Sequence, residues 1–169
     1  MSRRYVFRPV EKDEAAQMFD MVRQRMAWMD DKGIEQWNVA GYDEIYPLAY
    51  YEAAQARGEA FALADADTGE LVSAAVLLGE DERWDDRTPA LYVHNFVSRV
   101  GEKNVGALFL AHTEAYAVQR GKQFLRLDSA ENNASLAHYY DALGFEAAGF
   151  CTDGPYKGIL RQKALTRRA

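Results

Sequence analysis

The apolar positions at the start of the chain recur at steps of three and four residues, the period of a helix that buries one face. This spacing predicts a helix from Asp13, which can cap it, to about Asp31, with Gly33 at its end. A second helix is expected over roughly 44–57, with Gly58 as its terminator. The N-terminal part of the chain is therefore expected to be largely helical.

Short runs rich in β-branched, aromatic and other apolar residues predict seven strands. They lie at residues 4–10, 60–65, 71–78, 90–98, 123–128, 145–152 and 158–165. A further helix is expected from the turn at 99–104 to about Arg120. A last helix opens at Asn132 or Asn133 and ends at Gly144, so the order is βααβββαβαββ. The strand–helix–strand unit implies a parallel pair and the hairpins imply antiparallel pairs, so we expect a mixed sheet with helices packed on it.

The composition is typical of a globular domain and excludes a transmembrane span or long disorder. The length of 169 residues fits a single domain, 1–169, and 49% of the residues are apolar while 27% are charged. The longest purely apolar stretches are a few residues long, whereas a membrane helix needs about 20. The N-terminus lacks the apolar core of a secretory signal, so we expect a cytoplasmic protein with no membrane partner.

The net charge argues against one class of function, and the cysteine content limits the kinds of site that the chain can form. A formal net charge of -6 argues against nonspecific nucleic-acid binding, which needs a cationic surface. Four basic residues near the C-terminus are better explained as a solvated tail than as a binding patch: Arg161, Lys163, Arg167 and Arg168. The single cysteine, Cys151, excludes an intrachain disulfide and a cysteine metal cluster.

The turn at 99–106 is the first candidate for chemistry, because a strand there feeds a short loop that opens a helix. The first N–H groups of a helix have no partner within it and favour an anion. Gly101 and Gly106 allow close backbone approach, and Lys103 adds a positive charge. A pyrophosphate cradle and ordinary turn chemistry both fit this pattern, while a P-loop is absent.

The last predicted helix is the second candidate, because it carries polar residues in an apolar stripe. Asn133, Leu136, Tyr140 and Leu143 fall on one helical face. A polar Asn and Tyr in that stripe either border a cleft or are a capping Asn and a core Tyr with a satisfied hydroxyl.

Taken together, the two candidates resemble the GNAT superfamily of acyl-CoA-dependent N-acetyltransferases. The family's phosphate-loop pattern, Gln/Arg-x-x-Gly-x-Gly/Ala, falls on residues 101–106, where Gly101 replaces Gln/Arg, Asn104 replaces Gly and Gly106 fits. The family's Asn, Tyr and Gly-Phe spacing fits fully, at Asn133, Tyr140, Gly144 and Phe145. Three further segments resemble a bacterial branch of the superfamily: 33–37, 92–95 and 125–128.

The resemblance implies an α/β fold of the α+β type. Its central sheet is mixed and mostly antiparallel, with helices on both faces and a splayed parallel pair of the fourth and fifth strands. Acetyl-CoA is the implied cosubstrate, and no metal is implied. The implied cofactor-binding residues are Asn95, Phe96 and Val97 along the pantetheine arm, Lys103, Asn104, Val105 and Gly106 at the pyrophosphate, Arg99 as a substitute phosphate contact, and Asn133.

The resemblance also implies a direct attack of an amine on the thioester, with Tyr140 protonating the leaving thiolate. His94 is the best candidate for the base, and a buried structural His bonded to backbone is the alternative. Asp128 is a second candidate base, for which a turn-capping carboxylate is an equal explanation.

The segment after the first helix is expected to line the acceptor site. In the family this region covers the acceptor cleft, so Gln36 and Trp37 are candidate substrate-binding residues, with Tyr42 and Tyr46 beside them. A Trp that closes a small core is the alternative. Three functions stay open: acetylation of a small-molecule amine, acetylation of a protein lysine or N-terminus, and acyl-CoA binding without turnover. A homodimer is compatible with each of them.

Overall fold

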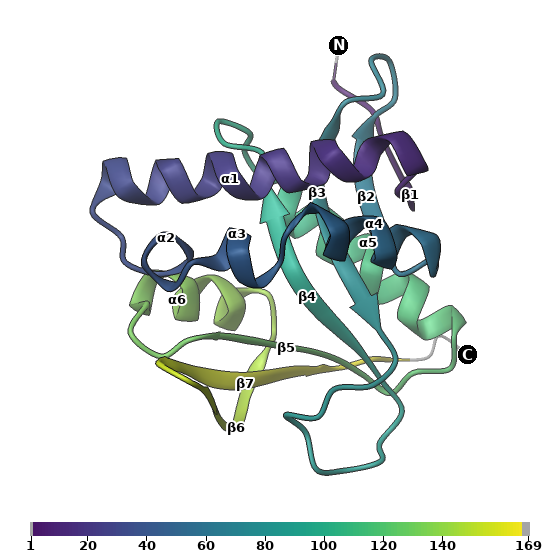
Figure 1. Cartoon of the computed structure of the whole chain (residues 1–169). Coiled ribbons are helices and arrows are strands. Elements are labelled where there is room, and N and C mark those ends of the chain that lie inside the picture. Colours follow the sequence, from purple (N-terminus) through teal and green to yellow (C-terminus); the bar gives the residue numbers. More distant parts are fainter. Residues whose placement is uncertain (1, 167–169) are drawn as a thin grey trace. The chain divides into compact units, whose positions relative to one another are not determined.

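The computed structural model describes residues 2–166, and its seven strands form one sheet in the order β1-β2-β3-β4-β5-β7-β6 (Figure 1). The strands are β1 (Tyr5–Pro9), β2 (Ala60–Asp65), β3 (Leu71–Leu78), β4 (Ala90–Ser98), β5 (Phe124–Ala130), β6 (Glu146–Asp153) and β7 (Tyr156–Ala164). The helices are η1 (Lys12–Glu14), α1 (Ala15–Lys32), α2 (Trp37–Ala40), α3 (Tyr42–Ile45), α4 (Leu48–Ala56), α5 (Val105–Gln119) and α6 (Ala134–Ala142). The sheet is mostly antiparallel, with β4 and β5 parallel, and helices flank it, as the sequence predicts.

The described residues fall into two compact units. The first comprises residues 2–77 and 95–110, and the second comprises residues 78–94 and 111–166. Strand β4 and helix α5 each contribute residues to both units.

The first unit is built on β2, which is buried along its whole length. The Phe7 ring of β1 stacks on the Phe61 ring of β2 and meets the Phe109 ring of α5 edge-on, each with ring centroids 5.5 Å apart. Because side chains alternate along a strand, the alanines of β2 face the other side of the sheet, where α1 and α4 lie. Small side chains there let helices pack closely, so this strand has a helix layer on each face.

The N-terminus of the first long helix differs from its prediction. Asp13 does not cap it. Residues Lys12–Glu14 form a 3-10 turn whose capping box joins Glu11 and Glu14, and α1 begins at Ala15. The predicted end is confirmed, since Gly33 adopts a left-handed φ of 69° that favours glycine.

The helix predicted over 44–57 is wrong in its first half. Pro47 lacks an N–H and disfavours helical backbone at the residue before it, so Tyr46 adopts φ -121° and ψ 76°. The chain instead forms the short helices α2 and α3 before α4 starts at Leu48. Ile45, which ends α3, is 60% exposed.

The second unit contains the parallel ladder between β4 and β5. It joins Ala90–Tyr92 to Phe124–Arg126, so Val93 and His94 of β4 follow its last pair. On its other edge β5 pairs with β7 along its whole length, and β7 pairs with β6. The predicted parallel pair is thus hydrogen-bonded over three residues, and its pairing stops after them.

The solvated tail predicted for Arg161 and Lys163 is wrong. Both residues belong to β7, and Arg161 is only 3% exposed because its guanidinium donates to the Ser129 hydroxyl at 2.8 Å. Lys163 pairs with Glu114 at 2.8 Å. Arg167 and Arg168 lie outside the described residues. Among residues 2–166, no helix is both long enough and apolar enough to cross a membrane.

Candidate functional site

The turn between β4 and α5 has the backbone of an anion cradle. Gly101 and Asn104 both adopt left-handed backbone, with φ values of 91° and 64°. Asn104 thus preserves the turn where the family pattern has glycine, as Asn tolerates this conformation better than most residues. The helix begins at Val105 and Gly106, whose N–H groups lie in its first turn and lack intrahelical partners.

The two basic side chains near this turn, Arg99 and Lys103, differ in how free they are to bind an anion. The Arg99 guanidinium donates to the Leu71 carbonyl at 2.9 Å and pairs with Glu70 at 3.1 Å, so its charge is already compensated. Lys103 is exposed at the turn. Lys103 is therefore the better candidate to replace the side chain lost at Gly101.

Asn95 distorts β4 and joins it to the helices of the first unit. Its φ of 55° is left-handed, which a residue inside a strand seldom adopts. Its side-chain amide donates to the Tyr42 hydroxyl and accepts from the Tyr50 hydroxyl, both at 2.7 Å. Burial raises the pKa of both tyrosines, that of Tyr50 to about 12. The side chain of Asn95 is thus occupied, which leaves only its backbone for the predicted cofactor contact.

Phe96 and Val97, the other two residues predicted to bind the pantetheine arm, also contact residues of the first unit. The Phe96 ring stacks on Phe109 with centroids 5.6 Å apart. The Val97 carbonyl accepts a hydrogen bond from the Ser73 hydroxyl at 3.0 Å. Neither contact involves the amide N–H of these residues, on which the prediction of strand-like binding depends.

The predicted acceptor-site residues begin a row of aromatic rings. Gln36 precedes α2, and Trp37 stacks on Tyr42 with centroids 4.3 Å apart and planes 6° apart. The row continues through Tyr46 to Tyr50 at centroid distances of 4.9 and 4.8 Å. Two rings of this row, Tyr42 and Tyr50, carry the hydroxyls that hydrogen-bond the Asn95 side chain. The segment is therefore tied to β4 by side-chain contacts that no spacing in the sequence predicts.

The last helix places Asn133 and Tyr140 as a cap and a core residue. The Asn133 Oδ1 accepts the Leu136 N–H at 3.0 Å, which is the capping contact. Tyr140 is 6% exposed and packs edge-on against Phe145, with centroids 5.6 Å apart. Burial raises the pKa of its hydroxyl, so Tyr140 is fully protonated at neutral pH. A protonated hydroxyl is what a proton donor requires.

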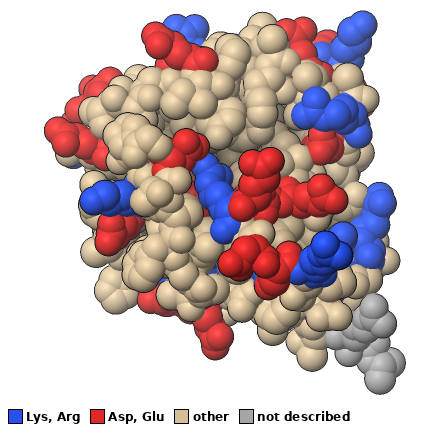
Figure 2. Space-filling view, turned by 60° about the horizontal axis from the view of Figure 1, so that its bottom comes forward, with Lys and Arg blue, Asp and Glu red and all other residues tan. Residues whose placement is uncertain are grey.

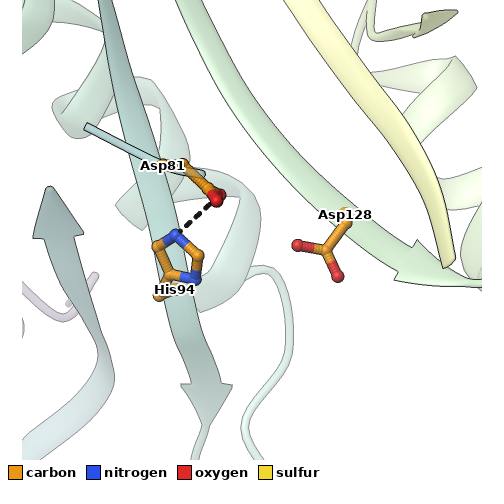
Figure 3. A group of neighbouring side chains, drawn as sticks. All are labelled: Asp81, His94 and Asp128. Atoms are coloured by element: carbon orange, nitrogen blue, oxygen red, sulfur yellow. Dashed lines mark ion pairs between the residues drawn. The ribbon is translucent and has the colours of Figure 1, made fainter. Parts of the chain in front are cut away.

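His94 pairs with Asp81, a residue of the charged loop between β3 and β4. The His94 Nε2 and Asp81 Oδ2 atoms lie 3.0 Å apart, and the two side chains are 13% and 8% exposed (Figure 3). The partner of Nε2 is therefore a side chain, whereas the alternative expected from the sequence was a bond to backbone. Burial alone would raise the pKa of Asp81, but the contact with His94 and the Arg83 backbone N–H outweigh it and lower that pKa. Asp81 is therefore an anion beside the imidazole.

Asp128 completes this group from β5. Its nearest carboxylate oxygen lies within 4.8 Å of the ligand atoms of Asp81 and His94. It accepts a hydrogen bond from the Tyr156 hydroxyl at 2.6 Å and contacts the Arg83 guanidinium at 3.5 Å. The predicted turn-capping role is wrong, because Asp128 sits inside the strand. These three side chains have the donor types of a divalent-cation site, but Arg83 and Tyr156 already compensate Asp128.

The loop that carries Asp81 is anchored by a buried arginine. Arg126 of β5 is 2% exposed, forms a bidentate contact with Asp86 at 2.7 and 2.8 Å, and lies 4.1 Å above the Trp84 ring. Such planar, two-point contacts hold a carboxylate in one orientation. The charged stretch 80–87 is thus fixed against β5, and no charge pattern in the sequence signals this contact.

A cavity of about 640 Å³ opens beside His94. It is lined by the end of β3, the loop after it, His94 and part of β6. Its volume lies within the usual range for small-molecule sites, roughly 300–1,000 Å³. The base candidate of the second unit therefore borders a space of the size that a small acceptor needs.

No protein-family model matches the sequence, and no curated protein matches it. Solved structures match it over nearly its whole length. A GNAT-family acetyltransferase from Listeria monocytogenes 4b F2365 is 20% identical, with 95% of each chain covered and a TM-score of 0.77. A PaiA N-acetyltransferase from Thermoplasma acidophilum in complex with coenzyme A is 16% identical, covers 97% of this chain and 99% of its own, and has a TM-score of 0.73. The chain has the GNAT fold.

This similarity confirms the predicted fold class. A third GNAT-fold relative, an aminoglycoside 6'-acetyltransferase type Ii, is 16% identical over 97% of this chain and 99% of its own, with a TM-score of 0.67. The identities are low, so the similarity establishes the architecture, and the roles of individual residues remain predictions.

Proposed function

We propose that the chain is an N-acetyltransferase that moves an acetyl group from acetyl-CoA to a primary amine of a small molecule. The observation that carries the proposal is the GNAT fold shared with a coenzyme A complex over 97% of the chain. The left-handed Asn104 at the start of α5 supports it, because it supplies the turn that an anion cradle requires.

Acetyl-CoA is proposed to bind through the backbone of Asn95, Phe96 and Val97. Its pyrophosphate would accept hydrogen bonds from the N–H groups of Val105 and Gly106, while Lys103 offsets its charge. Asn133 would orient the pantetheine arm through its remaining amide N–H groups, since its Oδ1 caps α6.

His94 is proposed to deprotonate the acceptor. An alkyl ammonium with a pKa near 10.4 is neutral in roughly one molecule in 2,500 at pH 7, which costs about 4.6 kcal/mol. An imidazole is suited to remove that proton at neutral pH. The Asp81 carboxylate at 3.0 Å holds the ring in position and stabilises the imidazolium that forms. Asp81 is thus a positioning residue.

The amine nitrogen then bonds to the thioester carbonyl carbon as the carbon–sulfur bond breaks, and the sulfur leaves with the electron pair. Tyr140 is proposed to give its proton to this thiolate. Burial raises the pKa of Tyr140, which makes it a weaker acid than free tyrosine. The hydroxyl therefore keeps its proton until negative charge develops on the sulfur. The nitrogen loses its second proton as the amide forms, and this proton returns to Tyr140 through water. His94 then releases its own proton to solvent.

A small acceptor fits the cavity beside His94. Its volume of about 640 Å³ lies within the usual range for small-molecule sites, and the cavity is open to solvent. The fold similarity to an aminoglycoside acetyltransferase agrees with this choice.

Acetyl-CoA is expected to raise the melting temperature of the protein. At a concentration 100 times its dissociation constant it should stabilise the fold by about 2.7 kcal/mol, or about 5–10 °C for a chain of this length. Differential scanning fluorimetry measures the shift, and isothermal titration calorimetry measures binding directly. ATP at equal concentration is the control for nonspecific binding of phosphate. Absence of both a shift and binding heat at millimolar acetyl-CoA would refute the cofactor assignment.

Replacing His94 with glutamine is expected to lower kcat/KM for the acceptor about 100-fold at pH 7. The loss should shrink as the pH approaches the pKa of the amine, because the acceptor then needs no base. Steady-state rates between pH 7 and pH 10 measure this. His138→Gln, an exposed position on α6, is the matched control and should behave as wild type. A loss that stays constant over this pH range would contradict the role of base.

A further inference from the structure

The cavity beside His94 is acidic in a way that the proposed transfer to a simple amine does not require. Four carboxylates line it, from Glu80, Asp81, Glu82 and Asp153, against a single guanidinium from Arg83. The side chains of Glu80, Glu82 and Asp153 are exposed at its rim. Figure 2 shows acidic side chains gathered on the face that it turns forward, with basic groups among them.

Two of these carboxylates are already used within the protein. Asp81 pairs with His94 at 3.0 Å, and Asp153 contacts the Arg83 guanidinium at 3.3 Å. Glu80 and Glu82 differ, because within residues 2–166 neither side chain forms an ion pair or hydrogen bond. The rim therefore carries two uncompensated negative charges on the loop that the Arg126–Asp86 contact anchors.

The same cavity also has an apolar part. Leu78 and Cys151 line it, and so does Phe150, which is 75% exposed. A large exposed ring beside carboxylates suits a ligand with both methylene groups and positive charge, which an aromatic face attracts. The cavity is thus lined both by apolar side chains and by negatively charged ones.

His94 lies in the wall of the cavity with one ring nitrogen already engaged. Its Nε2 is inaccessible to solvent and lies 3.0 Å from the Asp81 carboxylate, so a ligand does not contact that atom. The other ring nitrogen, Nδ1, is therefore the atom that would meet an amino group in the cavity.

Resting on the proposed function, we propose that the acceptor is a flexible aliphatic di- or polyamine. One amino group reaches His94 and is acetylated. A second, still protonated, is held by Glu80 and Glu82, while the methylene chain between them contacts Phe150 and Leu78. Acetylation turns the first amino group into a neutral amide, so the product keeps only the contact of its second amino group with the rim and is released.

The test compares 1,5-diaminopentane with 1-aminopentane, which has the same carbon chain and one amino group. The diamine is expected to show a kcat/KM about tenfold or more above the monoamine at low ionic strength. The advantage should fall as salt rises to 1 M, where charges are screened over about 3 Å. Released thiol reports turnover, and calorimetry in the presence of coenzyme A reports binding.

The variants assign the preference to the rim. In Glu80→Gln/Glu82→Gln the ratio of diamine to monoamine kcat/KM should fall towards one. Glu146→Gln removes an exposed carboxylate from β6 outside the cavity lining, and it should leave the ratio unchanged. A retained fold is checked by circular dichroism and melting temperature.

The outcomes separate this inference from the proposed function. Equal turnover of the two amines overturns the inference and leaves the acetyltransferase proposal intact. Diamine binding that depends on Glu80 and Glu82, without turnover of any amine, supports the site and refutes the reaction. Acetylation of a lysine-rich peptide but not of the diamine overturns the inference in favour of a protein acceptor, as does a diamine that neither binds nor reacts.

Discussion

Replacing Tyr140 with phenylalanine is expected to lower kcat by roughly 10²–10⁴ with little change in the affinity for acetyl-CoA. The ring stays, so its edge-on packing with Phe145 is retained and only the hydroxyl is lost. A proton that is delivered to the leaving thiolate acts only in the transition state, which is why kcat and not binding should respond. The loss should be smaller for acyl donors whose leaving thiol is more acidic.

The neighbouring Tyr139 provides a matched control for this experiment. It lies on the same helix and is only half-buried, so Tyr139→Phe should leave kcat near that of wild type. If the Tyr140 hydroxyl only satisfies a core hydrogen bond, the variant should lose about 1 kcal/mol of stability and keep its turnover. Steady-state rates and a denaturation curve on the same protein distinguish the two cases. An unchanged kcat would reject Tyr140 as the proton donor.

Replacing Gly106 with glutamate is expected to abolish binding of coenzyme A. Gly106 is the second residue of α5, where the unpaired N–H groups of the helix form the proposed pyrophosphate site. A glutamate there adds bulk and a negative charge at the place where the two phosphates must approach the backbone. Calorimetry with coenzyme A should detect no heat of binding at millimolar ligand.

Two further variants make this result interpretable. Ala115→Glu adds the same charge at an exposed position of the same helix, and it should bind coenzyme A as wild type does. Gly106 is buried, so the glutamate variant needs a check of its fold by circular dichroism. If it does not fold, the exposed Lys103→Glu replaces it, with an expected loss of affinity of about tenfold. Normal affinity in the folded variants would place the phosphates elsewhere.

The strands and glycine-ended helices could be predicted from sequence because their signals are local. The bounds of β2, β3 and β4 match the predicted runs, which are apolar on both faces as central strands are. Gly33 ends α1, and Asn133 caps α6, since each acts within a few residues of its position. The break at Pro47 was also present in the sequence, where the proline carries the signal that ends the preceding helix.

The candidate site was less predictable because its key contacts join distant residues. His94 and Asp128 are recognisable by type, but Asp81 lies in a loop that looks solvated until Arg126 anchors it through Asp86. The contacts of Asn95 with Tyr42 and Tyr50 span 53 and 45 residues, so no periodicity reveals them. Such pairs depend on how the strands and helices pack, which only the folded chain defines.

Strand β6 ends the sheet, and this position bears on the solubility of the protein. It pairs with β7 on one side, so its other edge carries backbone groups to which a strand of another molecule could add. Two features oppose this: the register shifts between Ala147 and Gly149, and the exposed carboxylates of Glu146 and Asp153 flank the strand. Because like charges repel, these carboxylates disfavour the approach of the same edge of a second molecule.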